Sequence, residues 1–240
     1  MRKTLAAFVS VLAFAAVAHA QEIDPPPAVP TTSGDASLSS GRTNGSGEVI
    51  VAAAAGWPGI WVEVEVAFDS VFNAGLRLGL VYGSPFMALA PGVGGEAAVP
   101  LRLHVFGEDK LDLAIFATPA FVIGEAAITG EGGTAAAGDL GIGSRIEGGL
   151  VAGYRALDDV TLILGLGGHV GVVGTPSTAT YSAVGGVFAR IGIEGLISRD
   201  TLLFAVGDAG IGIAPTGSPQ LFGDPVTPLL RLSLGVGYVP

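Results

Sequence analysis

The side chains best suited to chemistry are two histidines, His104 and His169, because imidazole exchanges a proton near neutral pH. His104 and Asp112 are expected on one face of a short hairpin, where they could form an acid–base pair or a proton relay. His169 is expected opposite Arg145 or Glu147. Neither histidine is accompanied by the nucleophile or the clustered ligands that hydrolysis or metal binding needs. We therefore expect internal hydrogen bonds at both histidines, and no enzyme activity, cofactor or metal.

A larger polar set consists of six arginines and eight acids that alternate with apolar residues. In residues 60–68, for example, Glu63 and Glu65 lie on one side of an extended chain and the valines on the other. Such an acidic stripe could favour cations in a pore. We prefer ion pairing, because the two signs nearly balance. The set comprises Glu63, Glu65, Arg77, Glu96, Arg102, Asp112, Asp139, Arg145, Glu147, Arg155, Arg190, Glu194, Asp208 and Arg231.

The register expected for two hairpins brings opposite charges together. Counting from the expected turn centres places Glu65 opposite Arg77, and Arg190 opposite Asp208. Facing opposite charges contribute about 0.2–1 kcal/mol each on an ordinary sheet. An unpaired charge away from water is costly. These residues therefore predict an internal ion-pair network.

The elements that would position these residues are β-strands. After residue 46 the alternation has period two, which is typical of strands, and no helical periodicity appears. Short polar turns alternate with longer segments rich in Gly, Pro, Ser and Thr, as in outer-membrane barrels with short periplasmic turns. The turns lie near 69–73, 107–110, 156–159 and 198–200, and the longer segments near 84–94, 125–137, 174–180 and 214–227. Ten strands are expected, with a first strand near 48–55, and eight is the alternative if that segment does not pair.

The first 46 residues differ from the rest. Residues 1–20 have a basic start, a short apolar run and an Ala-x-Ala ending, which predicts a signal peptide cleaved between Ala20 and Gln21. Residues 21–46 are rich in Pro, Ser, Thr and Gly and predict a disordered periplasmic tail. We favour a spacer here, and the alternative is a segment that enters the barrel lumen. The barrel domain is expected over residues 47–240.

Composition indicates where the apolar face of the strands lies. Half of the residues (50%) are hydrophobic, 13% are charged, the net charge is −10 and cysteine is absent. The negative charge argues against nucleic acid as a partner, and without cysteine there are no disulfides or thiolate metal sites. Lys110 is the only lysine after residue 20, although soluble proteins usually cover their surface with Lys and Glu. We therefore expect the apolar face to contact lipid and the charged face to line a lumen.

The signal peptide, the alternation, the turn and loop asymmetry and a last strand carrying Tyr238 resemble the small bacterial outer-membrane β-barrels, such as the barrel domain of outer-membrane protein A. The resemblance covers residues 47–240. It implies an all-β fold: a closed antiparallel up-and-down transmembrane barrel in the outer membrane of a Gram-negative bacterium. Family members usually end on Phe or Trp, whereas this chain ends Tyr238-Val239-Pro240.

Three functions are consistent with these observations. The first is a non-enzymatic structural or docking component of an adhesion, motility or secretion assembly, with envelope proteins as partners of the tail or outer loops. The second is a narrow channel for ions or small solutes, because a barrel of this size has a narrow lumen. The third is a soluble periplasmic β-protein. We expect the first.

Overall fold

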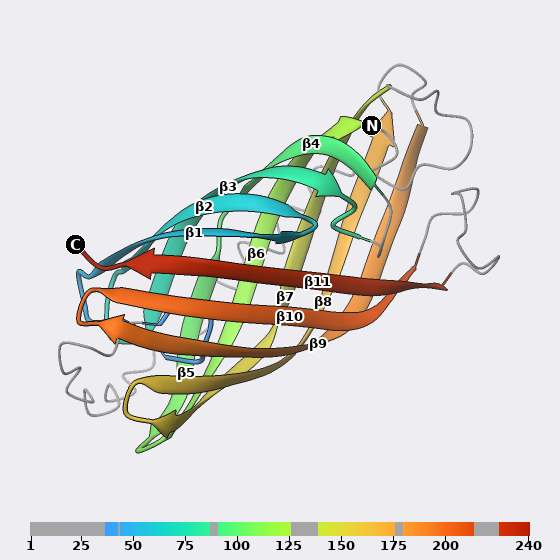
Figure 1. Ribbon diagram of the computed structural model, residues 1–240. Helices are drawn as coiled ribbons and strands as arrows, with labels where there is room; N and C mark the ends of the chain where they lie inside the picture. The colour runs from blue at the N-terminus through green and yellow to red at the C-terminus, as the bar shows by residue number, and fades with distance from the viewer. Residues whose placement is uncertain (1–36, 43, 87–90, 126–138, 176–179, 214–225) are drawn as a thin grey trace, which may run out of the picture. The chain divides into compact units, whose positions relative to one another are not determined.

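The computed structural model describes residues 37–42, 44–86, 91–125, 139–175, 180–213 and 226–240. The strands of this part of the chain form one antiparallel sheet (Figure 1). Its strands are β1 (Val49–Trp57), β2 (Gly59–Ala67), β3 (Phe72–Gly83), β4 (Pro91–Ala98), β5 (Leu101–Glu108), β6 (Leu111–Glu125), β7 (Leu140–Leu157), β8 (Val160–Thr175), β9 (Thr180–Ser198), β10 (Thr201–Ile213) and β11 (Val226–Tyr238). In this part of the chain there is no helix of the length and apolar character needed to cross a bilayer.

The sheet closes on itself. β1 pairs with β2 on one side and with β11 on the other, so the first and last strands meet (Figure 1). β4 and β5 both lie between β3 and β6 and are two halves of one barrel strand. The division falls at Pro100, which has no N–H to donate to the ladder. The predicted ten-stranded closed antiparallel barrel is therefore confirmed, and the eight-stranded alternative is wrong.

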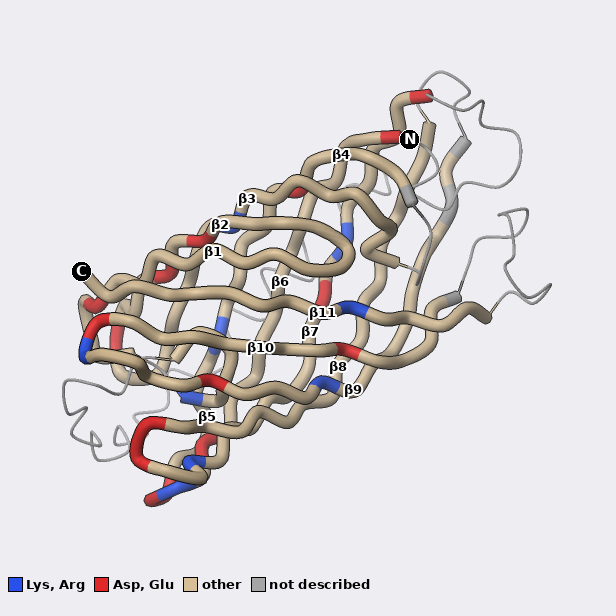
Figure 2. Tube along the Cα trace, in the orientation of Figure 1, with Lys and Arg blue, Asp and Glu red and all other residues tan. Residues whose placement is uncertain are grey.

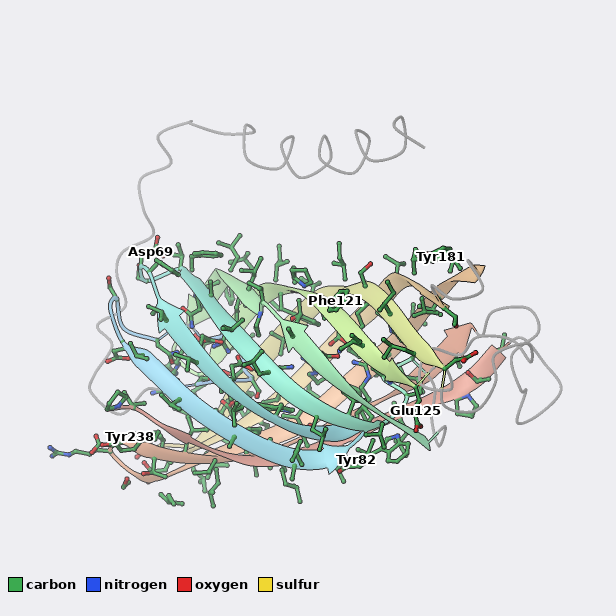
Figure 3. The ribbon with its side chains drawn as sticks, turned by 90° about the horizontal axis from the view of Figure 1, so that it is seen from above. Asp69, Tyr82, Phe121, Glu125, Tyr181 and Tyr238 are labelled. Atoms are coloured by element: carbon green, nitrogen blue, oxygen red, sulfur yellow. The ribbon has the colours of Figure 1, made fainter. Side chains whose placement is uncertain are left out.

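The two ends of the barrel differ in their connections. Four short turns, after β2, β5, β7 and β9, lie at one end, which we call the turn rim. The opposite end, the loop rim, carries Pro58 between β1 and β2 and the connections that are only partly described. Figure 3 shows Asp69 and Tyr238 at the turn rim and Tyr82, Glu125 and Tyr181 at the loop rim. Charged residues gather at the turn rim (Figure 2).

One turn shows how local chemistry sets the register. The carboxylate of Asp69 accepts hydrogen bonds from the N–H groups of Val71, at 2.8 Å, and Phe72, at 2.7 Å. Such a side chain holds a tight turn by bonding backbone that follows it. As a result Ala67 pairs with Asn73, and the hairpin closes one residue earlier than the sequence predicts.

This turn changes the predicted charge pairing. Glu63, and not Glu65, lies opposite Arg77, so the predicted Glu65–Arg77 pair is wrong by two residues. In the β9–β10 hairpin, Arg190 lies opposite Asp208, which is the predicted register.

The two faces of the barrel wall have opposite character. Large apolar side chains point outward, and Leu166 on β8 is 68% exposed. The side chains of Glu63, Arg102 and Asp208 point inward and are buried. Figure 3 shows side chains projecting from the outside of the wall along its length. This distribution is the reverse of a soluble protein, and it places the polar chemistry of the chain in the lumen.

Aromatic rings fill part of the space above the inward-facing glycines. A Cβ atom on Gly167 would lie 2.6 Å from the ring of Phe188, so the ring lies against the bare backbone. Glycine at this position therefore lets a neighbouring strand's side chain occupy the lumen.

Candidate functional site: the lumen

The centre of the lumen is organised around one carboxylate, Glu147 on β7. Glu147 accepts a hydrogen bond from Arg145 Nη1 at 2.9 Å and from Arg190 Nη2 at 3.2 Å, and a third from Arg231 Nη1. Arg145 also donates from Nη2 to Glu96 at 2.8 Å. These residues come from β4, β7, β9 and β11, so the contacts cross the lumen and tie distant strands together.

A second carboxylate, Asp208 on β10, completes this group. Arg190 donates to it from both Nε and Nη2, at 2.8 and 3.0 Å, which is the two-point geometry that guanidinium groups form with carboxylates. The guanidinium of Arg190 also lies 5.0 Å from the ring centre of Phe116 and 5.5 Å from that of Phe188. We call Glu96, Arg145, Glu147, Arg190, Asp208 and Arg231 the central network.

Two further ion pairs lie on β2. Glu63 pairs with Arg77 at 2.6 Å, and Arg77 stacks over the ring of Trp61. Glu65 pairs with Arg102 and also accepts a hydrogen bond from Asn73 Nδ2 at 2.6 Å. Neighbouring acids on one strand thus have arginine partners from different strands.

The lumen also holds part of the chain that precedes β1. We call Ser37–Arg42 the lumen segment. Glu194 on β9 accepts hydrogen bonds from the Ser37 hydroxyl at 2.7 Å, the Leu38 N–H at 3.0 Å and the Ser39 N–H at 2.5 Å. Glu194 is therefore paired with the N–H and O–H groups of a turn.

An arginine binds the opposite side of the same turn. Arg102 donates to the carbonyl oxygens of Ser37 and Ser40, each at 2.9 Å. His104 Nδ1 lies 2.9 Å from the carbonyl oxygen of Gly41. The buried carboxylate of Glu194 thus accepts hydrogen bonds from the donors of the turn, and the buried guanidinium of Arg102 donates to its carbonyl oxygens. Together Glu194 and Arg102 clamp the segment.

The lumen segment contacts strands on several sides of the barrel. Leu38 packs with Ile50 on β1 and with Leu202 and Phe204 on β10. Arg42 pairs with Asp112 on β6 at 3.3 Å. Since Arg102 and Glu194 add β5 and β9, the segment lies inside the barrel. The tail was expected to be a spacer, and this is wrong for residues 37–42. These residues enter the lumen, which was the alternative expectation. Residues 21–36 lie outside the described residues.

Among the described residues, the hydrogen-bond contacts of the two histidines are with backbone and arginine. His104 and Asp112 each bind the lumen segment. His169 lies opposite Glu147 in the β7–β8 pairing, one of its two expected positions, and its Nδ1 is 3.4 Å from Arg231 Nη2. Within the described ranges no group of three His, Asp or Glu side chains could hold a metal ion.

The remaining predicted residues lie at the ends of the barrel. Asp139 immediately precedes β7 at the loop rim and is partly buried. Arg155 lies near the end of β7 at the turn rim and is partly buried. The expected cleavage residues Ala20 and Gln21 lie outside the described residues.

Sequence reasoning missed a contact at the loop rim. Phe86, beyond the end of β3, is buried with Val173 and Val184, and its ring centre is 6.0 Å from that of His169. A large aromatic residue in a segment otherwise rich in Gly, Pro and Ser was the available signal.

Between the two ends lies a cavity of about 170 Å³. Leu38 and Ser39 of the lumen segment form part of its wall, as do Pro58 and Pro85 from the loop rim. The wall also includes five carboxylates and five guanidinium groups, among them all of the central network. The site is thus a charge-balanced cavity that extends from the lumen segment to the loop rim.

No protein-family model matches the chain, and no curated protein matches it in sequence. Among solved structures, it is similar to OmpT (in-vitro folded), an outer membrane protein of Vibrio cholerae, with a TM-score of 0.36 and 12% identity. The alignment covers 82% of this chain and 62% of that chain, so this chain spans less than two thirds of its length. The closed barrel is shown by the strand pairing itself.

Substitution of Glu194 tests the clamp. In Glu194→Ala, three hydrogen bonds to a carboxylate are lost, and each such bond contributes about 1.5–3 kcal/mol. We expect the lumen segment to leave its position, so that trypsin cuts after Arg42 at least about tenfold faster than in the unmodified barrel. Limited proteolysis in detergent micelles with mass spectrometry measures this rate. Asp200→Ala, an acid at the same rim, is the matched control, and equal rates in the two variants would contradict the clamp.

Substitution of Glu147 tests the central network. Glu147→Gln removes the charge on which three guanidinium groups converge, and removal of one partner from a buried ion pair costs about 3–5 kcal/mol. Glu63→Gln is the control. Its partner Arg77 keeps 28% of its side chain exposed, so water can solvate the unpaired guanidinium and this variant should lose less free energy of unfolding. Urea titration followed by tryptophan fluorescence measures both free energies of unfolding. Equal losses in the two variants would show that Glu147 has no central role.

Proposed function

We propose that this protein is a non-enzymatic integral β-barrel of a Gram-negative outer membrane and a structural or docking component of a cell-envelope assembly. The observation that carries the docking role is the clamp formed by Glu194 and Arg102. It fixes the point at which the residues preceding Ser37 join the barrel.

The outward face supports insertion in a membrane. Burial of apolar surface contributes about 25 cal/mol per Å², and the exposed leucines, isoleucines and valines would forgo this contribution in water. Charges would normally coat a water-facing surface, but here they are paired in the lumen. A soluble periplasmic protein would need the reverse arrangement, so we disfavour that alternative.

The occupied lumen favours docking over conduction. A channel needs a continuous path, whereas the lumen segment lies across the turn-rim end and the central network crosses the middle. Barrels with open aqueous channels have about 16–18 strands. A narrow channel would require the lumen segment to leave, which the clamp opposes.

Two outward leucines of equal exposure test membrane insertion. Leu166 lies near the middle of β8 and is 68% exposed, while Leu157 ends β7 at the turn rim and is 67% exposed. In a bilayer, Leu166→Arg should cost about 2–4 kcal/mol and Leu157→Arg about 0–1 kcal/mol, because the cost of a charge depends on depth. Urea unfolding in phospholipid vesicles measures both. Equal small costs would indicate that the outward face is in water.

Cross-linking in intact cells tests the docking role. We expect the tagged barrel to recover an envelope protein from the outer-membrane fraction, and to recover less of it when Glu194→Ala releases the lumen segment. Asp200→Ala should recover as much as the unmodified chain. The docking role fails if no envelope protein is recovered and deletion of the protein leaves envelope phenotypes unchanged.

A further inference from the structure

The barrel closes where its first and last strands meet, and the ladder that joins them is short. β1 and β11 form seven residue pairs, from Val51 with Tyr238 to Trp57 with Leu232, and we call this ladder the seam. On its other side β11 forms thirteen pairs with β10, so the loop-rim part of β11 extends beyond the tip of the β1–β2 hairpin (Figure 1). Because fewer pairs give fewer hydrogen bonds, the seam is a weak place in the described wall.

The residue types in the seam weaken it further. β1 contributes four consecutive alanines, Ala52–Ala55, and β11 contributes Gly235 and Gly237. Alanine and glycine are depleted in strands, and glycine has no side chain to pack against a neighbour. Above the alanines the outer face carries an apolar groove of about 570 Å³. The inner face of the seam therefore gains little from the side chains of its own two strands.

Side chains from the neighbouring strands cover this inner face. The ring of Phe204 on β10 lies against Gly235 and stacks on Trp61 of β2, with the ring centres 5.7 Å apart. Leu202 on β10 lies against Gly237, where a Cβ atom would be 3.0 Å from the leucine Cγ. Because the strand order is β2, β1, β11, β10, these side chains span the seam from one side to the other.

Leu38 of the lumen segment completes the cover. It is buried in one apolar cluster with Leu202 and Phe204 of β10 and with three residues of β1, which are Ile50, Ala52 and Ala54. Its N–H donates to Glu194 at 3.0 Å, so the clamp holds this side chain over the seam. Among the described residues, Leu38 is the one buried member of this cluster that belongs to no strand. It can therefore leave without breaking a ladder.

We propose that the lumen segment is a latch that keeps the barrel wall closed at the seam. Leu38 holds β1 against β11, and release of the segment lets this ladder open before the rest of the wall. Withdrawal of the segment would then open the wall toward the surrounding lipid at one defined place. The latch is a property of the barrel itself, and only the opening toward lipid rests on the proposed membrane location.

Hydrogen exchange of the full chain in detergent micelles, measured by mass spectrometry, tests the latch. Leu38→Ala removes the apolar contacts of the latch while the backbone of the segment can keep its hydrogen bonds to Glu194. We expect the amides of β1 to exchange about tenfold faster or more in this variant, and those of β7 and β8 to exchange at the unmodified rate.

Leu229→Ala is the matched control. Leu229 is equally apolar and buried, and it lies on the loop-rim part of β11 in a cluster that includes no residue of β1. In this control β1 should exchange as it does in the unmodified chain.

A disulfide across the seam separates loosening of the seam from a general loss of stability. The chain has no cysteine, so paired substitutions introduce only the intended bond. Ala53→Cys with Val236→Cys joins facing positions of the seam, and Ile146→Cys with Val170→Cys joins facing positions of β7 and β8. In the Leu38→Ala background the first disulfide should restore the protection of β1, and the second should not.

Heat-modifiable migration on a gel establishes that each variant is folded, and Leu38→Val replaces Leu38→Ala if the latter fails to fold. The latch is overturned if β1 exchanges as slowly in the folded Leu38 variant as in the unmodified chain, or if Leu229→Ala accelerates β1 as much. It is also overturned if the two disulfides have the same effect. In Glu194→Ala, faster cutting after Arg42 with unchanged exchange of β1 would overturn the latch and leave the clamp and the docking role standing.

Discussion

The rest of the structure depends on one constraint: each strand presents its apolar residues outward, so its polar residues are forced into a narrow lumen. Successive side chains of a strand point to opposite faces, so Glu63 and Glu65 must face inward once Val62 and Val64 face outward. Charges confined in this way must find partners across the barrel, because leaving one unpaired is costly. Glu147 shows the result, with arginines from three strands converging on a single carboxylate.

The same constraint explains why the lumen segment is held where it is. Near the turn rim, Glu194 and Arg102 point inward without facing each other, and a short turn of backbone supplies donors to one and acceptors to the other. Ser37 and Ser40 suit this position because small hydroxyl side chains fit between the two charges and bond each other at 2.5 Å. The segment therefore belongs to the polar interior of the barrel, although it is not part of the sheet.

Much of this arrangement could be predicted from sequence, because alternation is a local property. The faces of β2 and the pairing of Arg190 with Asp208 follow from counting residues along strands and across a short turn. The Glu65–Arg77 pairing failed because the register depends on how Asp69 closes its turn, which counting does not reveal. Lumen entry of the tail was only the less favoured alternative, for a different reason: Ser37–Arg42 has no apolar periodicity, and its position is determined by two charges far away in the chain.

Formal charge and hydrogen-bonding capacity are separate properties of such a lumen. A guanidinium group has five N–H donors, and a carboxylate has two oxygens. When equal numbers of each are enclosed, the charges cancel, but geometry determines whether every donor meets an oxygen. In the described lumen Arg190 donates to Asp208 from two of its nitrogens, whereas the Nε atoms of Arg145 and Arg231 have no hydrogen-bond partner. A lumen can therefore be balanced in formal charge while some of its arginine donors lack an oxygen partner among the described residues.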